Sequence, residues 1–281
     1  PLWVDVASEE VDESKTTFII PFREPSLYPS LVTDVTKLGT ELYLFLKWIK
    51  KIAAYDEVSG RRWLLENVGE ADGDIAVLKK DGREEHFKFF RRTLNVSQAP
   101  SRVNADRLTQ EYRANVKQRE ISIAFALDQN GNLDLRLAHA MYGGVYSFLP
   151  LGEARSGAKF PIQGDFLVQP GRDAINYEAE WNHWLVEEVA KLCKEAVAYF
   201  QKHPTWKYQY LSAFEFTKSP GLESYGKLFG PKLIEPIEAF LHSTRPVPTA
   251  DGGWGKIDEV IKIQEREASL KELIDQGLTT D

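Results

Sequence analysis

Two dipeptides that favour tight turns, Asp81-Gly82 and Asn130-Gly131, each stand between strand-like stretches of this sequence. Such dipeptides accept the positive φ angles of two-residue hairpin turns, which join antiparallel strands. Apolar side chains also alternate before the second turn, at Ile121, Ile123, Phe125 and Leu127. A third hairpin is predicted in "KIAAYDEVSGRRWLLENV", residues 51–68. We therefore expect an antiparallel sheet.

The clearest helix signal lies in residues 178–202, "EAEWNHWLVEEVAKLCKEAVAYFQK". Its apolar side chains are spaced three or four apart, which places them on one face of a helix: Trp181, Trp184, Leu185, Val189, Leu192, Ala196 and Phe200. We interpret Trp181, Trp184 and Phe166 as core residues. Sheet and helix signals together predict an α+β fold, with helices packed on one face of an antiparallel sheet.

Other segments give weaker signals. Residues 16–23, "TTFIIPFR", are typical of a strand, and 24–30 of a loop. Residues 40–52, "TELYLFLKWIKKI", are apolar nearly all round and predict a short buried helix. Residues 105–118 predict a helix with a thin apolar stripe, and 141–160 a glycine-rich connection.

We expect three parts in the chain. Residues 1–23 form the end of an upstream domain or a linker strand, and 24–204 form the main α+β domain. Residues 205–281 mix aromatic side chains with proline and glycine, and predict a small, mostly helical domain. That domain is expected to end in a short β-turn element and a charged helix over 264–276.

Composition excludes several classes of protein. The chain has 281 residues, of which 43% are hydrophobic and 27% charged, as in ordinary globular proteins. It has a single cysteine, Cys193, which lies among apolar residues at helical spacing and is interpreted as an inert packed thiol. A net charge of −7 argues against a general nucleic-acid coat, so the short basic runs at 47–51 and 91–92 are interpreted as solvated faces. No membrane-spanning run is found, and a reducing, cytoplasmic setting is expected.

The familiar catalytic motifs are absent from the sequence. The five histidines are scattered without zinc-ligand spacing, and no nucleophile elbow, P-loop or dinucleotide fingerprint occurs. "DQNGNLDL" faintly resembles a calcium loop, but it lacks the twelfth-position glutamate and is better explained as a hairpin turn. The chain begins with Pro1 and has one methionine, Met141, so it is interpreted as a segment of a longer protein.

One arginine stands out in "KFPIQGDFLVQPGRDAI", residues 159–175. Arg172 follows Gly171 on a turn between a predicted strand and the long helix. It can be a helix-entry residue paired with Asp173 or Glu178. It can also clamp phosphate oxygens, because a planar guanidinium on a rigid turn is suited to bidentate binding. The residues alone leave both readings open.

The segment around this arginine resembles the region after the ATP-binding domain in sacsin and sacsin-like prokaryotic proteins. The resemblance rests on a succession of short motifs in family order: Phe148-Leu149-Pro150-Leu151, Gly164-Asp165-Phe166, Arg172-Asp173-Ala174-Ile175 and Trp181-Asn182. It is specific over residues 143–195 and looser over 16–140. "VPTADGGWGKIDEV" is also similar to a tail element of the family.

The resemblance implies the middle, or transducer, part of a GHKL ATPase, with a ribosomal-protein-like β-α-β fold. Such a part couples ATP binding in an N-terminal domain to conformational change and partner binding. The E-x-x-x-N-x-x-D segment that holds ATP and Mg²⁺ in that domain is missing here. The nucleotide and metal are therefore expected in the full-length protein, with the upstream ATPase domain as a partner in cis and a protein client.

The resemblance also implies that Arg172 senses the γ-phosphate, while Gly171 allows close approach of the backbone. Pro170-Gly171 departs from the small polar residues that relatives carry at this place. The alternative is a nucleotide-independent module that binds protein or nucleic acid. On neither reading does the segment catalyse a reaction by itself.

Overall fold

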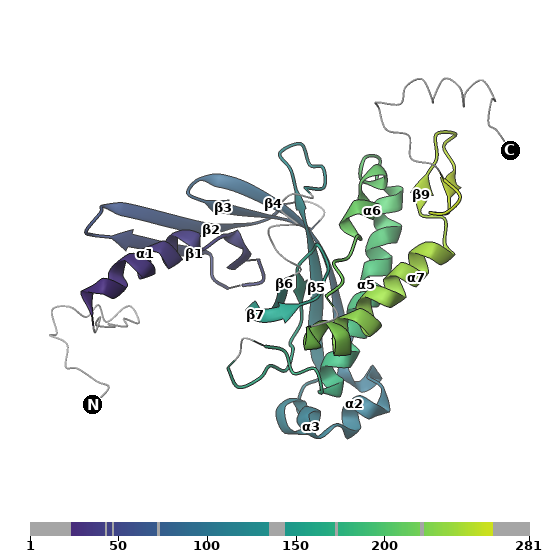
Figure 1. Ribbon diagram of the computed structural model, residues 1–281, viewed down its shortest axis with the longest axis horizontal. Helices are drawn as coiled ribbons and strands as arrows, with labels where there is room; N and C mark the ends of the chain where they lie inside the picture. The colour runs from purple at the N-terminus through teal and green to yellow at the C-terminus, as the bar shows by residue number, and fades with distance from the viewer. Residues whose placement is uncertain are drawn as a thin grey trace. The chain divides into compact units, whose positions relative to one another are not determined.

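The computed structural model describes residues 24–42, 44–46, 48–71, 74–134, 144–171, 174–219 and 222–260 (Figure 1). The chain divides into two compact units. One comprises Pro1–Leu38 with Ala54–Trp63, and the other comprises Gly39–Ala53 with Leu64–Asp281. The predicted strand at 16–23 and the predicted tail helix at 264–276 lie outside the described residues.

The first unit contains a short 3₁₀ turn, η2 (Pro25–Leu27), and helix α1 (Tyr28–Lys37). The prediction of a loop over 24–30 is wrong, because Pro29 stands in the first turn of α1, where its missing N–H costs no hydrogen bond. The Tyr28 hydroxyl donates to Asp56, which also accepts the Val58 N–H at 3.0 Å. The hydrogen bond to Asp56 raises the pKa of Tyr28 to about 12.

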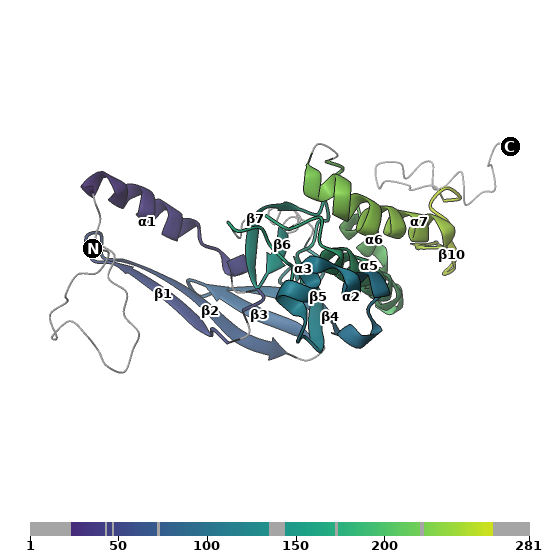
Figure 2. The same ribbon diagram turned by 90° about the horizontal axis from the view of Figure 1, so that it is seen from below.

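Eight strands in the described residues form one sheet, in the order β1-β2-β3-β4-β5-β8-β6-β7. They are β1 (Lys51–Asp56), β2 (Arg61–Ala71), β3 (Ile75–Lys80), β4 (Arg83–Asn95), β5 (Gln118–Leu127), β6 (Gly144–Ser147), β7 (Leu149–Arg155) and β8 (Ile162–Gln163). Strands β2 to β5 pair antiparallel with their neighbours (Figure 2), and β6 pairs parallel with β8. The predicted α+β fold with an antiparallel sheet is confirmed.

Both predicted turns are present. Asp81 and Gly82 have φ angles of 50° and 83°, as a two-residue hairpin between β3 and β4 requires. At the second turn the Asp128 carboxylate accepts the N–H groups of Asn130 and Asn132, each at 2.8 Å. Residues 128–133 therefore make a turn, as expected. Residues 135–143, which would carry the rest of the second arm, lie outside the described residues.

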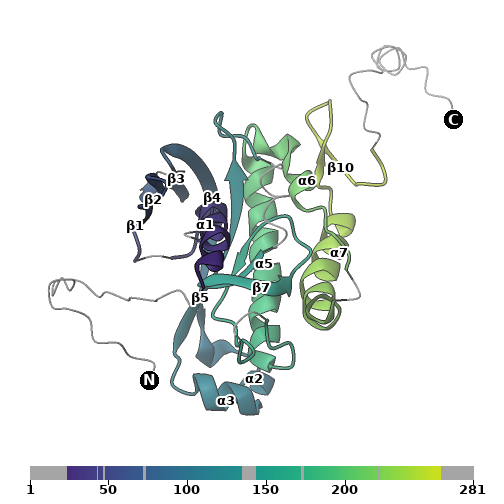
Figure 3. The same cartoon turned by 60° about the vertical axis from the view of Figure 1, so that its left-hand side comes forward.

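Helix α5 (Glu180–Lys202) confirms the strongest helix prediction. It packs along β4 and β5 (Figure 3), and its buried residues include Trp181, Leu185, Val189 and Phe200. Alternation along β5 sends Ile123 and Phe125 into the core shared with α5, while Ala124 joins a second cluster on the opposite face. Two separate apolar cores therefore lie on the two faces of the sheet.

The helix predicted over 105–118 is present only in part, as α3 (Arg107–Arg113). A separate short helix, α2 (Ser101–Ala105), comes before it and follows a 3₁₀ turn, η4 (Val96–Gln98). Asp106 separates them, because its extended backbone and its carboxylate, which accepts the Thr109 N–H at 2.9 Å, make it the N-cap of α3. Strand β5 then takes residues from Gln118 onward.

The C-terminal part consists of short elements. They are η5 (Trp206–Tyr208), α6 (Tyr210–Ala213), the π-helix η6 (Tyr225–Ile234), α7 (Glu235–Ser243) and the small hairpin β9 (Val247–Pro248) and β10 (Trp254–Gly255), of which η5, η6 and α7 pack on α5. These elements agree with the expected small helices and short β-turn. Residues Leu228, Phe229, Leu233 and Ile237 are fully buried in the same core as α5.

The prediction of a buried helix over 40–52 is wrong. Among the described residues of this segment, Thr40–Leu42 alone form a 3₁₀ turn, η3, and β1 begins at Lys51. Phe45 is buried, yet Trp48 is 92% exposed. A segment that is apolar on all sides can be a buried helix, but it can equally be a non-helical segment that crosses a core. Here the backbone is already bonded to β2 at Lys50, whose carbonyl accepts the Asn67 N–H at 2.8 Å.

The expected glycine-rich connection over 141–160 is also wrong in part, because it contains β6 and β7. Phe148 joins these strands with a φ of 66°, a conformation that side chains other than glycine seldom adopt. The Gln163 side chain supports this turn by accepting the Phe148 N–H at 2.9 Å. In the described part of the chain, no helix is long and apolar enough to cross a membrane.

Candidate functional site

The loop that carries the predicted sensor arginine is a hairpin-like excursion between β8 and α5. Val168 and Ile175 face each other in an antiparallel bridge, and the Gln169 N–H donates to the Ala174 carbonyl at 2.9 Å. Gly171 is exposed at the tip. Arg172 and Asp173 lie outside the described residues, so both readings of Arg172 remain predictions.

The root of this hairpin is tied to the first turn of α5 by Asn182. The Asn182 side chain is fully buried and accepts the Leu167 N–H through Oδ1 at 2.8 Å. Its Nδ2 donates to the carbonyls of Leu167 at 2.7 Å and Asn176 at 2.6 Å. One amide therefore bonds both arms of the loop, which fixes their separation and their position on the helix.

Trp181, the other half of the Trp-Asn motif, is hydrogen-bonded to the segment that follows β8. Its Nε1 donates to the Asp165 carbonyl at 2.8 Å, and its ring meets that of Trp184 edge-on at 5.3 Å. Trp181, Trp184 and Phe166 are 0%, 3% and 1% exposed, so the prediction that they belong to the core is confirmed. Residues of two sequence motifs thus meet in space to build one support.

The Asp165 carboxylate is shared by two arginines that the sequence analysis did not single out. Arg113, at the end of α3, donates to Oδ1 at 2.9 Å, and Arg119, at the start of β5, donates to Oδ2. The Asp165 side chain is 12% exposed, so it is largely removed from water. These partners lie 52 and 46 positions away in the chain, which is why no local pattern revealed them.

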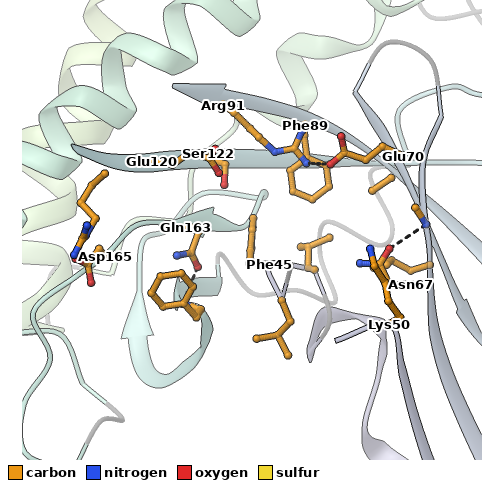
Figure 4. Close-up of a pocket in the computed structure, with 17 residues that line it drawn as sticks. Phe45, Lys50, Asn67, Glu70, Phe89, Arg91, Glu120, Ser122, Gln163 and Asp165 are labelled. Carbon is orange, nitrogen blue, oxygen red and sulfur yellow. Dashed lines mark hydrogen bonds and ion pairs between the residues drawn. The ribbon is translucent and has the colours of Figure 1, made fainter. Parts of the chain in front are cut away.

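Beside Asp165, a cavity of about 570 Å³ opens over the sheet face opposite α5 (Figure 4). The lining residues come from four parts of the second unit: the segment before β1, the β2–β4 strands, the start of β5, and β8 with the turn before β7. They include Phe45, Lys50, Asn67, Glu70, Ala76, Leu78, Phe89, Arg91, Arg119, Glu120, Ser122 and Asp165. Its floor is apolar and its rim carries charged groups.

Most of the charged groups on the rim are paired with each other. Arg91 donates to Glu70 at 2.5 Å, and its guanidinium lies 4.3 Å from the centre of the Phe89 ring. Arg119 is bonded to Asp165. Glu120 also has an interaction partner. Lys50 is exposed, and its ammonium makes no ion pair with a described residue.

The cysteine and the histidine of α5, Cys193 and His183, contact other protein groups. Among the described residues, no group of histidine, cysteine, aspartate or glutamate side chains is arranged to hold a metal ion. Cys193 is fully buried, and burial raises the pKa of its thiol far above the ordinary value, as expected for an inert thiol. The His183 Nε2 faces the Tyr177 carbonyl at 2.9 Å.

The chain is similar to a short part of a known plant protein. The chain is 35% identical over 131 residues to Protein NO VEIN of Arabidopsis thaliana. The matched segment is 47% of this chain but 4% of that protein, so the likeness concerns a small part of a much longer chain. No family model matches the sequence, and no solved structure matches it.

Proposed function

We propose that this chain is the middle, or transducer, module of a sacsin-like GHKL ATPase. It couples the binding of ATP and Mg²⁺ in an N-terminal domain of the same protein to conformational change and to the binding of a protein client. The proposal is supported by the order of the four sacsin-like motifs over residues 143–195. The likeness to a short part of the long Protein NO VEIN is consistent with a module of a larger protein.

The observation that carries the proposal is the hydrogen-bonded root of the 167–176 loop. A sensor arginine is useful only on a rigid support, since a misplacement of about 1 Å can cost on the order of a hundredfold in rate. Asn182 supplies such a support by bonding both arms of the loop from within the core. Arg172 follows Gly171, the exposed residue at the end of the described arm, and we expect its guanidinium to reach the γ-phosphate when the two parts close.

The same hydrogen bonds supply a route for coupling. Asn182 belongs to α5, whose 23 residues run through the main core of the second unit. A displacement of the loop toward bound nucleotide would therefore move the start of this helix with it, because the three hydrogen bonds resist separation. The helix would carry that displacement to the C-terminal elements packed on it, η6 and α7.

The test is steady-state ATP hydrolysis by the full-length parent protein, by this chain alone, and by the parent with Arg172→Ala. We expect activity in the parent, none in this chain, and a loss on the order of 10³-fold in the variant. Its free energy of unfolding should change by less than about 0.5 kcal/mol, as for an ordinary surface substitution. An unchanged rate in Arg172→Ala would contradict the sensor role.

A second candidate function, a nucleotide-independent interaction module, is favoured by exposed apolar side chains. Trp48 is 92% exposed. Phe148 and Leu149, which follow one another in the chain, are each 52% exposed. Large exposed aromatic side chains are frequent anchors in protein interfaces. A parent protein that binds a client but does not hydrolyse ATP would decide for this function, and Arg172 would then be a helix-entry residue.

A further inference from the structure

We propose that the cavity on the sheet face opposite α5 binds an apolar organic anion. The apolar body lies against Phe45 and Phe89, and the single negative charge lies at Lys50. This site belongs to the second unit alone, and it involves neither nucleotide nor an upstream domain. It therefore goes beyond the coupling function proposed above.

The floor of the cavity suits an aromatic or branched aliphatic body. Phe45, Leu78 and Phe89 are 6%, 1% and 2% exposed, so they form a firm apolar surface. The rings of Phe45 and Phe89 meet edge-on, with their centres 5.7 Å apart. A volume of about 570 Å³ lies within the ordinary range for small-molecule sites.

The charges on the rim select a monoanion. Arg91 and Arg119 are already bonded to Glu70 and Asp165, so their positive charges are largely neutralised before an anion enters. Lys50 is the cation on the described part of the rim that lacks an ion-pair partner. A ligand with several negative charges, such as a nucleotide, would meet a single unpaired cation among the described lining residues, and is therefore disfavoured.

Lys50 and Glu120 lie on different sides of the cavity. Figure 4 shows Lys50 beside Asn67 on one side, with Glu120 and Ser122 on the strand across it and Phe45 between them. An elongated ligand can therefore place its charged end at Lys50 and keep its apolar end away from Glu120. Two sources share this chemistry: a free organic acid, and the terminal carboxylate of a peptide that ends in an apolar residue.

The first experiment is a fluorescence titration of this chain with 8-anilinonaphthalene-1-sulfonate, a monoanion with an aromatic body. Lys50→Glu should weaken binding about fivefold to tenfold, because it replaces attraction by repulsion at the charged end. Ala76→Phe, which fills the floor, should abolish binding. Lys51→Glu is the matched control, since Lys51 pairs with Glu66 at 3.6 Å and should leave the affinity unchanged.

Far-UV circular dichroism and urea unfolding show which variants are folded. Lys50→Glu changes an exposed side chain, so it still tests the proposal if Ala76→Phe does not fold. Equal affinity of the wild type and Lys50→Glu would overturn the proposal. So would equally tight binding of N-phenyl-1-naphthylamine, a neutral probe of similar shape. Neither result involves ATP hydrolysis, so failure here is separate from failure of the coupling function.

Competition then distinguishes the two sources. Displacement of the probe by 3-phenylpropanoate but not by N-acetyl-Ala-Ala-Phe supports a free organic acid. Displacement by the peptide supports a peptide terminus, provided that its C-terminal amide does not compete. If neither carboxylate displaces the probe at millimolar concentration, the proposed anion site is wrong.

Discussion

The two faces of the sheet in the second unit are packed in different ways. On the α5 face, Phe125 contacts the rings of Phe160 and Phe200 at centre distances of 4.9 and 5.0 Å, and Phe90 contacts Phe200 at 5.3 Å. On the other face, Phe45 contacts Phe89 and Tyr146, and a cavity of about 570 Å³ remains beside them.

This difference follows from the elements that cover each face. A helix of 23 residues presents a continuous row of apolar side chains, which can interdigitate with a strand along its whole length. The opposite face is covered by η3, a turn of three residues, and by residues 44–46, which are neither helix nor strand. Such a cover supplies few large side chains. We infer that one face stabilises the fold and the other leaves room for a ligand.

Removing one large ring from each face gives the largest expected effect. Phe200→Ala should lower the free energy of unfolding by about 3–5 kcal/mol, because the ring is fully buried among other aromatic side chains. Phe45→Ala should cost about 1–3 kcal/mol, since its ring borders an existing cavity and loses fewer contacts. Urea unfolding of both variants measures the difference. Equal losses would show that the two faces are packed alike.

The hairpin root should respond next most strongly. Asn182→Ala leaves the Leu167 N–H and the Asn176 carbonyl without their side-chain partner, and should cost about 2–3 kcal/mol. Amide hydrogen exchange at Leu167 should accelerate in the variant. Asn104→Ala, on the exposed surface of α2, is the control and should change stability by less than about 0.5 kcal/mol.

Asn182→Asp sharpens this test. An ionised aspartate still accepts the Leu167 N–H, but it cannot donate to the two carbonyls and places a negative charge beside them. We expect it to be less stable than the wild type at pH 7 and to regain part of the loss on acidification. A variant as stable as the wild type at pH 7 would show that the amide does not hold the loop.

The smallest expected effect concerns the end of α5. The ring of His203 stacks on Trp206 at 3.8 Å, and its Nδ1 accepts the Trp206 N–H at 3.2 Å. Burial lowers the pKa of His203 from its ordinary value of 6.5. The unfolded chain therefore binds the proton more readily, so this contribution is present above pH 6.5 and is lost as the pH falls toward the folded-state pKa.

The measurement is the free energy of unfolding from pH 8 to pH 5 for the wild type and for His203→Gln. Carboxylates titrate in both proteins, so the difference between the two curves isolates the histidine. The wild type should lose more stability than the variant as the pH falls below 6.5. Parallel curves would mean that His203 is not held in its neutral form by the fold.

The sequence predicted those elements whose cause is local. Asp81-Gly82 makes its turn because these two residues tolerate positive φ, and α5 forms where apolar side chains repeat at helical spacing. The core positions of Trp181 and Trp184 follow from the same spacing. The prediction of a helix over 40–52 is wrong, because the same apolar side chains fit a buried helix and a non-helical segment that covers a sheet face equally well.

Most of the candidate site lay beyond sequence reasoning. The Trp-Asn and Gly-Asp-Phe motifs are visible in the sequence. The sequence does not indicate that the Asn182 side chain bonds both arms of the loop. No local pattern indicates that Arg113 and Arg119 share a partner, because Asp165 is distant from both in the chain. The cavity was also missed, because its walls come from segments that are far apart in sequence.

By itself, then, the sequence determined the α+β class, the hairpin turns and the long helix, since each depends on backbone preference and side-chain periodicity over a few neighbouring residues. Only the tertiary structure decided which residues carry the loop, which charges are neutralised, and where space remains on the sheet. Those features depend on distances between side chains that the chain brings together only when it folds, and no local pattern encodes a distance across the core.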